Sequence, residues 1–389
     1  MYLDFTEEQQ MIAQMAREFA EREIAPLDED YDFNRPLTNP EYKEIWSRLQ
    51  PAFANVISDM DLSDLDFIAI GLFVEEIFKA NPSLVCTVGM ALAPAGMIYM
   101  YGNEEQKERF VPPILAGRKI GCTAITEPDV GSNPAAIQTT AVREGDSYIV
   151  NGTKTWISNG SISDVVALIC RFSDGDDLSM GTLMVDREES PYETNELPHI
   201  GLKAFPTSEL FFTDCPVPAA NRLGGGNPGR GKGSKGLSMV FQGFEYARTL
   251  LALGSVAIAQ ASFEYATAYA KERKQWGKYL GEHQLIQEMI TDMSVSIETA
   301  RFLVYRALSL IQAKKRCERE ASMAKFYATE MAVEVTSKAI QIMGANGLSD
   351  EFPLERLFRD ARMLTIPDGT TQIQKLIVAR CHLGLGAFS

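Results

Sequence analysis

Apolar residues recur at helical spacing through residues 1–116, which predicts a helical N-terminal domain. Thr6 and Gln9 have the spacing of a capping box, and an apolar stripe over 12–24 continues the helix. The apolar run 84–100 contains Gly and Pro and is shorter than a membrane span of about 20 residues. We therefore expect a buried helix pair there rather than a membrane helix.

From Gly117 the pattern changes to short runs of β-branched and aromatic residues separated by Gly, Asn, Asp and Pro. Turn pairs such as Asn151–Gly152 and Asn159–Gly160 help to space these runs roughly 8–12 residues apart, which is typical of a β-barrel or sandwich. We expect strands at Cys122–Thr126, Ile137–Arg143, Tyr148–Asn151, Lys154–Ser158, Val165–Phe172, Gly181–Val185 and Leu210–Cys215.

Helical periodicity returns in the last third of the chain and predicts a bundle of long helices. The expected helices are Leu237–Glu272, Gln284–Lys314, Glu320–Met343 and Gln372–Leu383. The Gly-rich stretch before them lacks the Ser or Thr that a P-loop needs after its Gly-Lys pair, so it is interpreted as a linker. The predicted domains are an N-terminal helical domain at 1–116, a middle β-domain at 117–222, the linker at 223–236 and a helical bundle at 237–389.

Composition and charge narrow the classes of function. The chain has 389 residues, 46% hydrophobic and 23% charged, which is ordinary for a globular enzyme of two or three domains. The net charge of −15 argues against a nucleic-acid partner, because no basic stripe offsets it. The six Cys and three His are scattered, which predicts reduced core cysteines and no metal site. The acidic N-terminus has the features of neither a signal nor a transit peptide, so we expect a cytoplasmic protein without membrane insertion.

One short turn has the chemistry of a general base. In Pro367–Asp368–Gly369 the proline ends a helix and the glycine allows unusual backbone dihedrals. Thr370 or Thr371 can cap the helix that follows. Asp368 then sits at the tip of a helix-to-helix turn, where a carboxylate on rigid flanks can abstract a proton. Taken alone, the same residues are also typical of an ordinary capped turn.

Other segments suit a flat ligand that carries phosphates. They are Cys122–Asn133, Thr153–Gly160, Arg273–Gln287 and Gln341–Gly347. In order, they offer hydroxyls and amides in a turn, a Trp that could stack on a ring, basic side chains, and glycines that admit a close backbone approach. Taken singly, each segment also has an ordinary structural explanation. In the same order, these explanations are a capped turn, a Trp in the core of the β-domain, favourable charge at a helix C-terminus, and a helix C-cap.

Taken together, the order and spacing of these segments resemble the acyl-CoA dehydrogenase family of FAD flavoproteins. The motifs are AITEPDVGSN (124–133), NGTKTWISNG (151–160), RKQWGKYLGEHQLIQ (273–287), QIMGANG (341–347), LERLFRDAR (354–362) and DGTTQIQ (368–374). The resemblance implies a mainly α fold with an N-terminal helical domain, a middle β-barrel domain and a C-terminal four-helix bundle. It also implies FAD between β-domain and bundle, a homotetramer, and an electron-transfer flavoprotein as electron acceptor.

The same resemblance assigns roles to individual residues. Asp368 would abstract the α-proton of an acyl-CoA thioester while the β-hydrogen leaves as hydride to flavin N5. FAD contacts are implied at Ile125, Thr126, Trp156, Ser158, Thr370 and Gln372 and, from a neighbouring subunit, at Arg273, Trp276, Gln341 and Ala345. Substrate contacts are implied at Ser132, Phe244, Arg248 and Gly369.

The chain departs from the family pattern at the base itself. The commonest base of the family is a Glu preceded by Tyr, whereas this chain has Asp368 preceded by Pro367. Asp is one methylene shorter, a loss of about 1.5 Å in reach. A minority of the family places the base on a bundle helix, at the position of Ala247, which cannot serve. Glu245 lies two residues earlier and would face elsewhere on that helix.

The shorter base predicts a substrate whose α-carbon is held closer, or is bulkier, than in a linear chain. An alicyclic thioester such as cyclohexanecarboxyl-CoA fits, as in the family members of anaerobic aromatic degradation. Segments 58–67 and 224–236 also differ from the family and could reshape the acyl pocket. The alternatives are a dehydrogenase of short-chain or branched linear acyl-CoA in fatty acid degradation, an acyl-CoA oxidase, and a non-catalytic assembly protein of the same family.

Overall fold

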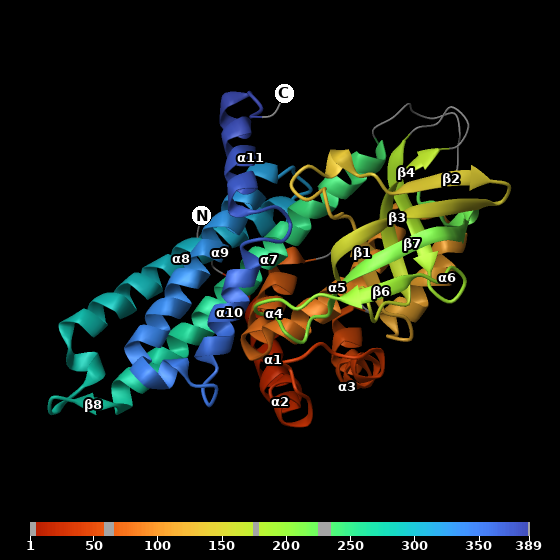
Figure 1. Cartoon of the computed structure of the whole chain (residues 1–389). Helices are drawn as coiled ribbons and strands as arrows, with labels where there is room; N and C mark the ends of the chain where they lie inside the picture. Colours follow the sequence, from red (N-terminus) through yellow and green to blue (C-terminus); the bar gives the residue numbers. More distant parts are fainter. Residues whose placement is uncertain (1–4, 58–65, 174–178, 225–234, 388–389) are drawn as a thin grey trace.

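The computed structural model describes residues 5–57, 66–173, 179–224 and 235–387, except the side chains at 29, 52–57 and 235–244. The predicted order of a helical domain, a β-domain and a helical bundle is confirmed (Figure 1). The curled sheet lies at one side of the molecule and the long bundle helices at the other, with the N-terminal helices between and below them in this view. The domain boundaries at 116, 222 and 236 stay predictions.

The N-terminal domain packs its helices around buried aromatic and aliphatic side chains such as Tyr42 and Trp46. Its elements are α1 (Glu7–Phe19), a π-helical turn (Ala20–Ile24), α2 (Leu27–Asp30), α3 (Asn39–Ile57), α4 (Phe67–Ala80), α5 (Pro82–Tyr101) and α6 (Glu104–Leu115). Thr6 and Gln9 form the predicted capping box at the start of α1.

The expected helix pair at 84–100 is wrong, because α5 is one continuous helix with Pro94 inside it. Proline removes one backbone donor, and burial against β1 and α6 stabilises the helix despite that loss. By length and composition α5 could cross a membrane, and it is the one described helix of which this is true. Part of its apolar surface is instead buried inside the fold, which is the arrangement of a core helix.

The β-domain is a seven-stranded sheet in the order β1-β4-β2-β3-β7-β6, with β5 paired to β4. The strands are β1 (Gly121–Ala124), β2 (Thr140–Glu144), β3 (Ser147–Ser158), β4 (Val165–Ser173), β5 (Met180–Asp186), β6 (Glu193–Glu196) and β7 (Thr207–Pro218). Asn151–Gly152 does not turn the chain, so the two strands predicted at 148–151 and 154–158 are one strand. Gly152 has φ 151° at an irregularity in the pairing with β7, and a Cβ there would lie 2.5 Å from Thr139 Oγ1.

The bundle is formed by three long helices and two shorter ones. They are α7 (Lys235–Glu272), α8 (Gln284–Gln312), α9 (Glu318–Met343), α10 (Leu354–Leu364) and α11 (Thr371–Leu383). A small hairpin, β8 (Lys274–Gln275) and β9 (Lys278–Tyr279), joins α7 to α8 at the tip of the bundle farthest from the sheet (Figure 1). The loop after β6 reaches this bundle, because Leu202 and Phe205 belong to its buried core.

Candidate active site

The base turn, residues 365–370, joins α10 to α11. Thr370 is the helix cap, and its hydroxyl accepts the amide of Ile373, so the first of the two predicted caps is the one used. Asp368 and Gly369 both have positive φ, 55° and 95°. Asp pays about 1 kcal/mol or more for such a backbone, which persists only where the surroundings impose it. At Gly369 an added Cβ would lie 2.6 Å from Gln374 Nε2, so a side chain would also displace a contact of the turn.

Side-chain donors hold the carbonyl groups of the base turn. The Asp368 carbonyl accepts from Arg248 Nε at 3.0 Å and from Gln374 Nε2 at 2.9 Å. Gln374 Nε2 also donates to the Gly369 carbonyl at 3.0 Å. Arg248 comes from α7 and Gln374 from α11, and both are buried. The predicted substrate contact Arg248 is thus a neighbour of Asp368.

A buried lysine completes this set. Lys325 of α9 has a fully buried side chain, and its Nζ donates to the carbonyls of Thr365 and Gly369 at 2.9 Å each. The two carbonyls lie on either side of Asp368 in the chain. Burial lowers the pKa of Lys325 to about 8, while the nearby Asp368 charge acts to raise it.

The Asp368 carboxylate itself accepts no hydrogen bond from the residues that the structure describes. Burial raises its pKa above the ordinary value, and the charges of Lys325 and Arg248 act in the opposite direction. The Nε of Arg248 and the Nζ of Lys325 donate to backbone carbonyls. The carboxylate therefore has the properties of a general base, because it is partly buried with a raised pKa, lies near positive charge and accepts no hydrogen bond within the described residues.

The helix position of the alternative base offers no acid. Ala247 has none, and Glu245 is engaged elsewhere, since its Oε2 accepts the amide of Cys317 at 3.0 Å at the start of α9. Cys317 Sγ lies 3.4 Å from the same oxygen. Glu245 therefore ties α7 to α9 rather than supplying a second base.

The β-domain brings four predicted flavin contacts together. Ile125 and Thr126 follow β1, and Trp156 and Ser158 end β3. The amide of Thr155 donates to the Thr126 carbonyl at 2.9 Å, so the two segments lie side by side. Trp156 has φ 58° where the pairing with β7 is irregular, and its side chain is 55% exposed. The ring is therefore displayed at the sheet and is not the core Trp that was its ordinary explanation.

A buried ion pair supports this edge of the sheet. Lys154 Nζ donates to Glu127 Oε1 and to the Ile125 carbonyl, both at 2.8 Å. The Glu127 carboxylate also accepts the amides of Gln138 and Thr139, at 2.6 and 2.9 Å, and the Thr139 hydroxyl at 2.6 Å. Burial alone would raise the pKa of Glu127, but these donors hold it below its usual value. The pair fixes the backbone at Ile125.

Other predicted contacts lie at the far tip of the bundle, namely Arg273, Trp276, Gln341 and Ala345. The Asn346 amide donates to the Tyr269 hydroxyl at 3.1 Å and so joins the end of α9 to the end of α7. Trp276 is 93% exposed beside the hairpin. Gln341 follows Lys325 on α9 by sixteen positions, a rise of about 24 Å, so the predicted flavin residues of one chain fall into two separate groups.

The remaining predicted site residues lie beside the base turn, in an exposed loop of the β-domain, or outside the described residues. Thr370 and Gln372 lie at the start of α11, next to the base turn. Ser132 is exposed in the loop that follows the bridge between Glu127 and Val130. The side chain of Phe244 lies outside the described residues, as do most of the predicted departures at 58–67 and 224–236.

Sequence reasoning missed Lys325, Gln374 and the Glu127–Lys154 pair. Lys325 stands in an apolar stripe of small residues on α9, and a lysine on a core-facing stripe needs a buried partner. That mismatch was a usable signal. Glu127 and Lys154 gave none, because they lie 27 residues apart and only the strand pairing brings them together.

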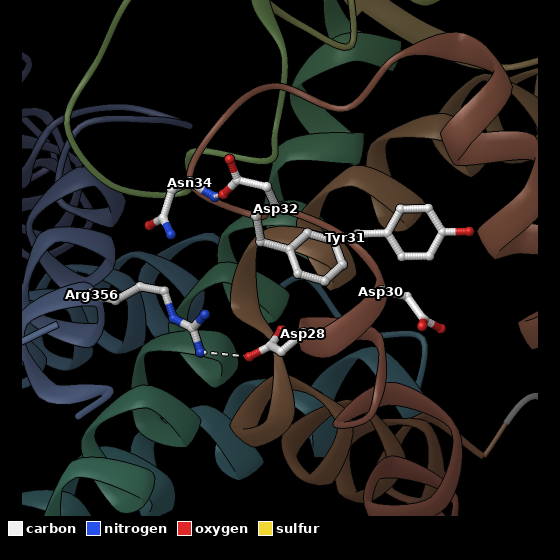
Figure 2. A pocket seen from close by; sticks show the side chains of 7 residues that line it. Asp28, Asp30, Tyr31, Asp32, Asn34 and Arg356 are labelled. Carbon is white, nitrogen blue, oxygen red and sulfur yellow. Dashed lines mark hydrogen bonds and ion pairs between the residues drawn. The ribbon is translucent and has the colours of Figure 1, made fainter. Parts of the chain in front are cut away.

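Two cavities lie near the start of α10, away from the base turn. One of about 330 Å³ is drawn in Figure 2, where Arg356 pairs with Asp28 at 3.0 Å beside Asp30 and Asp32. The other, of about 860 Å³, continues past Phe352 and shares Arg356. Both are rich in carboxylates and would repel an anionic ligand such as a nucleotide thioester. Within the described residues no three His, Cys, Asp or Glu side chains are arranged so that they could hold a metal ion.

A helical domain, a β-sheet and a bundle with a partly buried carboxylate on its base turn are together the features expected of a flavin-dependent dehydrogenase. Family models agree along almost the whole chain. "Acyl-CoA dehydrogenase, N-terminal domain" matches residues 6–118, the "middle domain" model matches 122–215, and the "C-terminal domain" model matches 234–383. The chain belongs to the acyl-CoA dehydrogenase family, whose members are FAD-dependent oxidoreductases.

Similar proteins come from several organisms. The chain is 34% identical to the "Acyl-CoA dehydrogenase, short-chain specific" of Clostridium acetobutylicum, over 97% of this chain and 99% of the relative. It is 34% identical to the "Caffeyl-CoA reductase-Etf complex subunit CarC" of Acetobacterium woodii, over 96% and 98%. It is 30% identical to the "Cyclohexane-1-carbonyl-CoA dehydrogenase" of Geobacter metallireducens, over 96% and 97%. A glutaryl-CoA dehydrogenase structure from Mycobacterium smegmatis, in complex with FADH2, has TM-score 0.87 at 26% identity, covering 99% of this chain and 97% of that one.

Proposed function

We propose that the protein removes the α- and β-hydrogens of an acyl-CoA thioester, with Asp368 abstracting the α-proton. The observation that carries the proposal is the state of the Asp368 carboxylate. It is partly buried with its pKa raised, accepts no hydrogen bond within the described residues, and lies on a turn whose carbonyls are held by donors from three helices. A base in that state is positioned before the substrate arrives, which is what proton abstraction requires.

FAD is the cofactor of the family, and the chain's own residues suit it. The displayed ring of Trp156 offers a face for stacking, and Thr126 and Ser158 supply hydroxyls on the neighbouring chain segments. The first turn of α11, with Thr370 and Gln372, provides a helix N-terminus. We assign these residues, with Ile125, to the flavin. When bound, FAD accepts the hydride from the β-carbon.

The second group of flavin residues, at the bundle tip, is assigned to the cofactor of a neighbouring subunit. Two observations support this assignment: the tip lies far from the sheet in one chain, and Trp276 is almost fully exposed there. The assignment requires an oligomer, and we propose the homotetramer. An electron-transfer flavoprotein is proposed as acceptor, in keeping with the Etf complex named for the Acetobacterium relative.

We further propose an alicyclic acyl group for the substrate. The shorter Asp368 must lie closer to its α-carbon than a Glu would. On α5, Cys86 lies near enough for the Asp368 charge to help burial raise its pKa. Gly89 and Gly96 of the same helix are exposed, and nothing lies within 4 Å of a Cβ built on either. One relative is named for an alicyclic substrate, which supports the proposal.

A short linear acyl-CoA is the second candidate, because another relative is named short-chain specific. The discriminating experiment is a turnover panel on the purified yellow protein, comparing cyclohexanecarboxyl-CoA with butyryl- and octanoyl-CoA under air-free conditions. The alicyclic proposal predicts that cyclohexanecarboxyl-CoA bleaches the flavin fastest. Much faster bleaching by butyryl-CoA would replace it with the linear one. Absence of bleaching by every thioester would favour a non-catalytic role, and hydrogen peroxide release in air would favour an oxidase.

A further inference from the structure

Lys325 is buried at a place where the reaction scheme has no use for a lysine. Its Nζ bridges the carbonyls of Thr365 and Gly369, one at the end of α10 and the other just before α11. These carbonyls flank Asp368, so the bridge spans the segment that carries the base. A fully buried lysine is costly, and a merely structural contact between two carbonyls could be made by a neutral donor.

The base turn also needs an external constraint. Two consecutive positive φ angles, 55° and 95°, are held by no regular secondary structure. Gln374 and Arg248 fix the Asp368 carbonyl, in the middle of the turn. Lys325 is the described side chain that joins both ends of the turn, from a third helix, α9.

We propose that Lys325 is a positioning residue for the reaction, which sets where the Asp368 carboxylate points and keeps it ionised when the substrate excludes water. The proposal rests on the proposed role of Asp368 as the base. Lys325 acts through the turn and touches neither thioester nor flavin in this scheme. A cation is needed because a bound substrate excludes water from the carboxylate, and the same charge that fixes the carbonyls also favours the carboxylate form.

Charged and titratable groups lie near this pair on several helices. Arg248 of α7 is a second cation beside Asp368, and its own pKa is lowered by burial. Cys86 of α5 is a thiol whose pKa is raised by burial and by the charges of Asp360 and Asp368. Glu330 of α9 acts to raise the pKa of Lys325. Removal of the Lys325 charge leaves one cation beside Asp368, so the pKa of Asp368 rises.

The test compares Lys325→Met with Lys338→Met in the flavin-loaded protein. Lys338 lies on the same helix but pairs with Asp292 at 2.8 Å on the surface. For Lys325→Met we expect kcat to fall about tenfold or more with little change in KM, as expected for a displaced base. We also expect the acid limb of the kcat–pH profile to move up by about one pH unit. Lys338→Met should leave both unchanged.

Two further variants separate the possible failures. Lys325→Arg keeps the charge and should recover part of kcat and the original acid limb, and it serves as the second variant should Lys325→Met not fold. Wild-type kcat and pH profile in Lys325→Met, or the same shifted acid limb in both Lys325 variants, would overturn the inference. Asp368→Asn tests the base separately: if it still exchanges the substrate α-hydrogen, the base assignment fails, whatever Lys325→Met does.

Discussion

The buried Glu127–Lys154 pair allows a quantitative prediction that links stability to the flavin site. Lys154→Met would remove two hydrogen bonds, to Glu127 and to the Ile125 carbonyl, and would leave a buried carboxylate without its counter-charge. Breaking a buried pair from one side typically costs 3–5 kcal/mol. Three donors remain on Glu127, from Gln138 and Thr139, so we expect a loss near the lower end, about 3 kcal/mol.

The pH dependence has a definite sign. Since the partners of Glu127 lower its pKa in the folded protein, their contribution is present above the ordinary Glu pKa and is lost as the pH falls through the lowered one. Without Lys154 the carboxylate can avoid its penalty by taking a proton. The variant should therefore be most destabilised at neutral pH and closer to wild type near pH 4–5.

The assay is urea unfolding of the flavin-loaded protein at matched concentration, with flavin stoichiometry measured alongside. Lys107→Met is the control, since Lys107 pairs with an exposed Glu104 and should cost below about 1 kcal/mol. Glu127→Gln combined with Lys154→Met should recover part of the loss and its pH dependence, because the buried charge is gone. A loss in Lys154→Met no larger than in the control, at every pH, would refute the reasoning.

The other predictions concern neighbouring acids. Asp360 is buried with its pKa raised to about 6, so its ionisation lowers the free energy of unfolding as the pH rises through that value. The free energy of unfolding of Asp360→Asn should match that of wild type near pH 4 and exceed it at pH 7 by about 1–3 kcal/mol. Equal stability of both proteins at pH 7 would count against this prediction. Glu245→Gln should weaken the contact between α7 and α9, because Glu245 accepts the amide of Cys317. The rate of substrate α-hydrogen exchange should stay within about threefold of wild type. Near-complete loss of exchange would instead make Glu245 the base. Asp368→Glu adds about 1.5 Å of reach and should shift the kcat/KM ratio toward butyryl-CoA over cyclohexanecarboxyl-CoA, and an unchanged ratio would remove base length as the cause of selectivity.

The periodicity of the sequence was enough to predict the helices of the bundle, because helices such as α8 and α9 bury an apolar stripe whose spacing can be read from neighbouring residues. The strands of the sheet were harder to predict. Asn151–Gly152 has the composition of a hairpin turn, yet the pairing of β3 with β7 and the close approach of Thr139 use it as an irregularity within a strand. Likewise Pro94 suggested a break that the packing of α5 overrides.

The candidate site also has a part that the sequence predicts and a part that it does not. The cap at Thr370 and the positive φ of Gly369 follow from the residue types in DGTTQ, so they were predictable. The positive φ of Asp368 itself, and the donors that impose it, depend on contacts between α7, α9 and α11. Lys325 is 43 residues from Asp368, and no local rule joins them.

The most direct test of the central claim is α-hydrogen exchange in D₂O, followed by mass spectrometry of the acyl-CoA in the presence of Asp368→Asn or wild-type protein. This measurement reports proton abstraction without requiring net oxidation. The account predicts exchange with wild type and a rate lower by about 100-fold or more in Asp368→Asn, with flavin still bound. An exchange rate in the flavin-loaded variant close to that of wild type would contradict it and would place the base elsewhere in the chain.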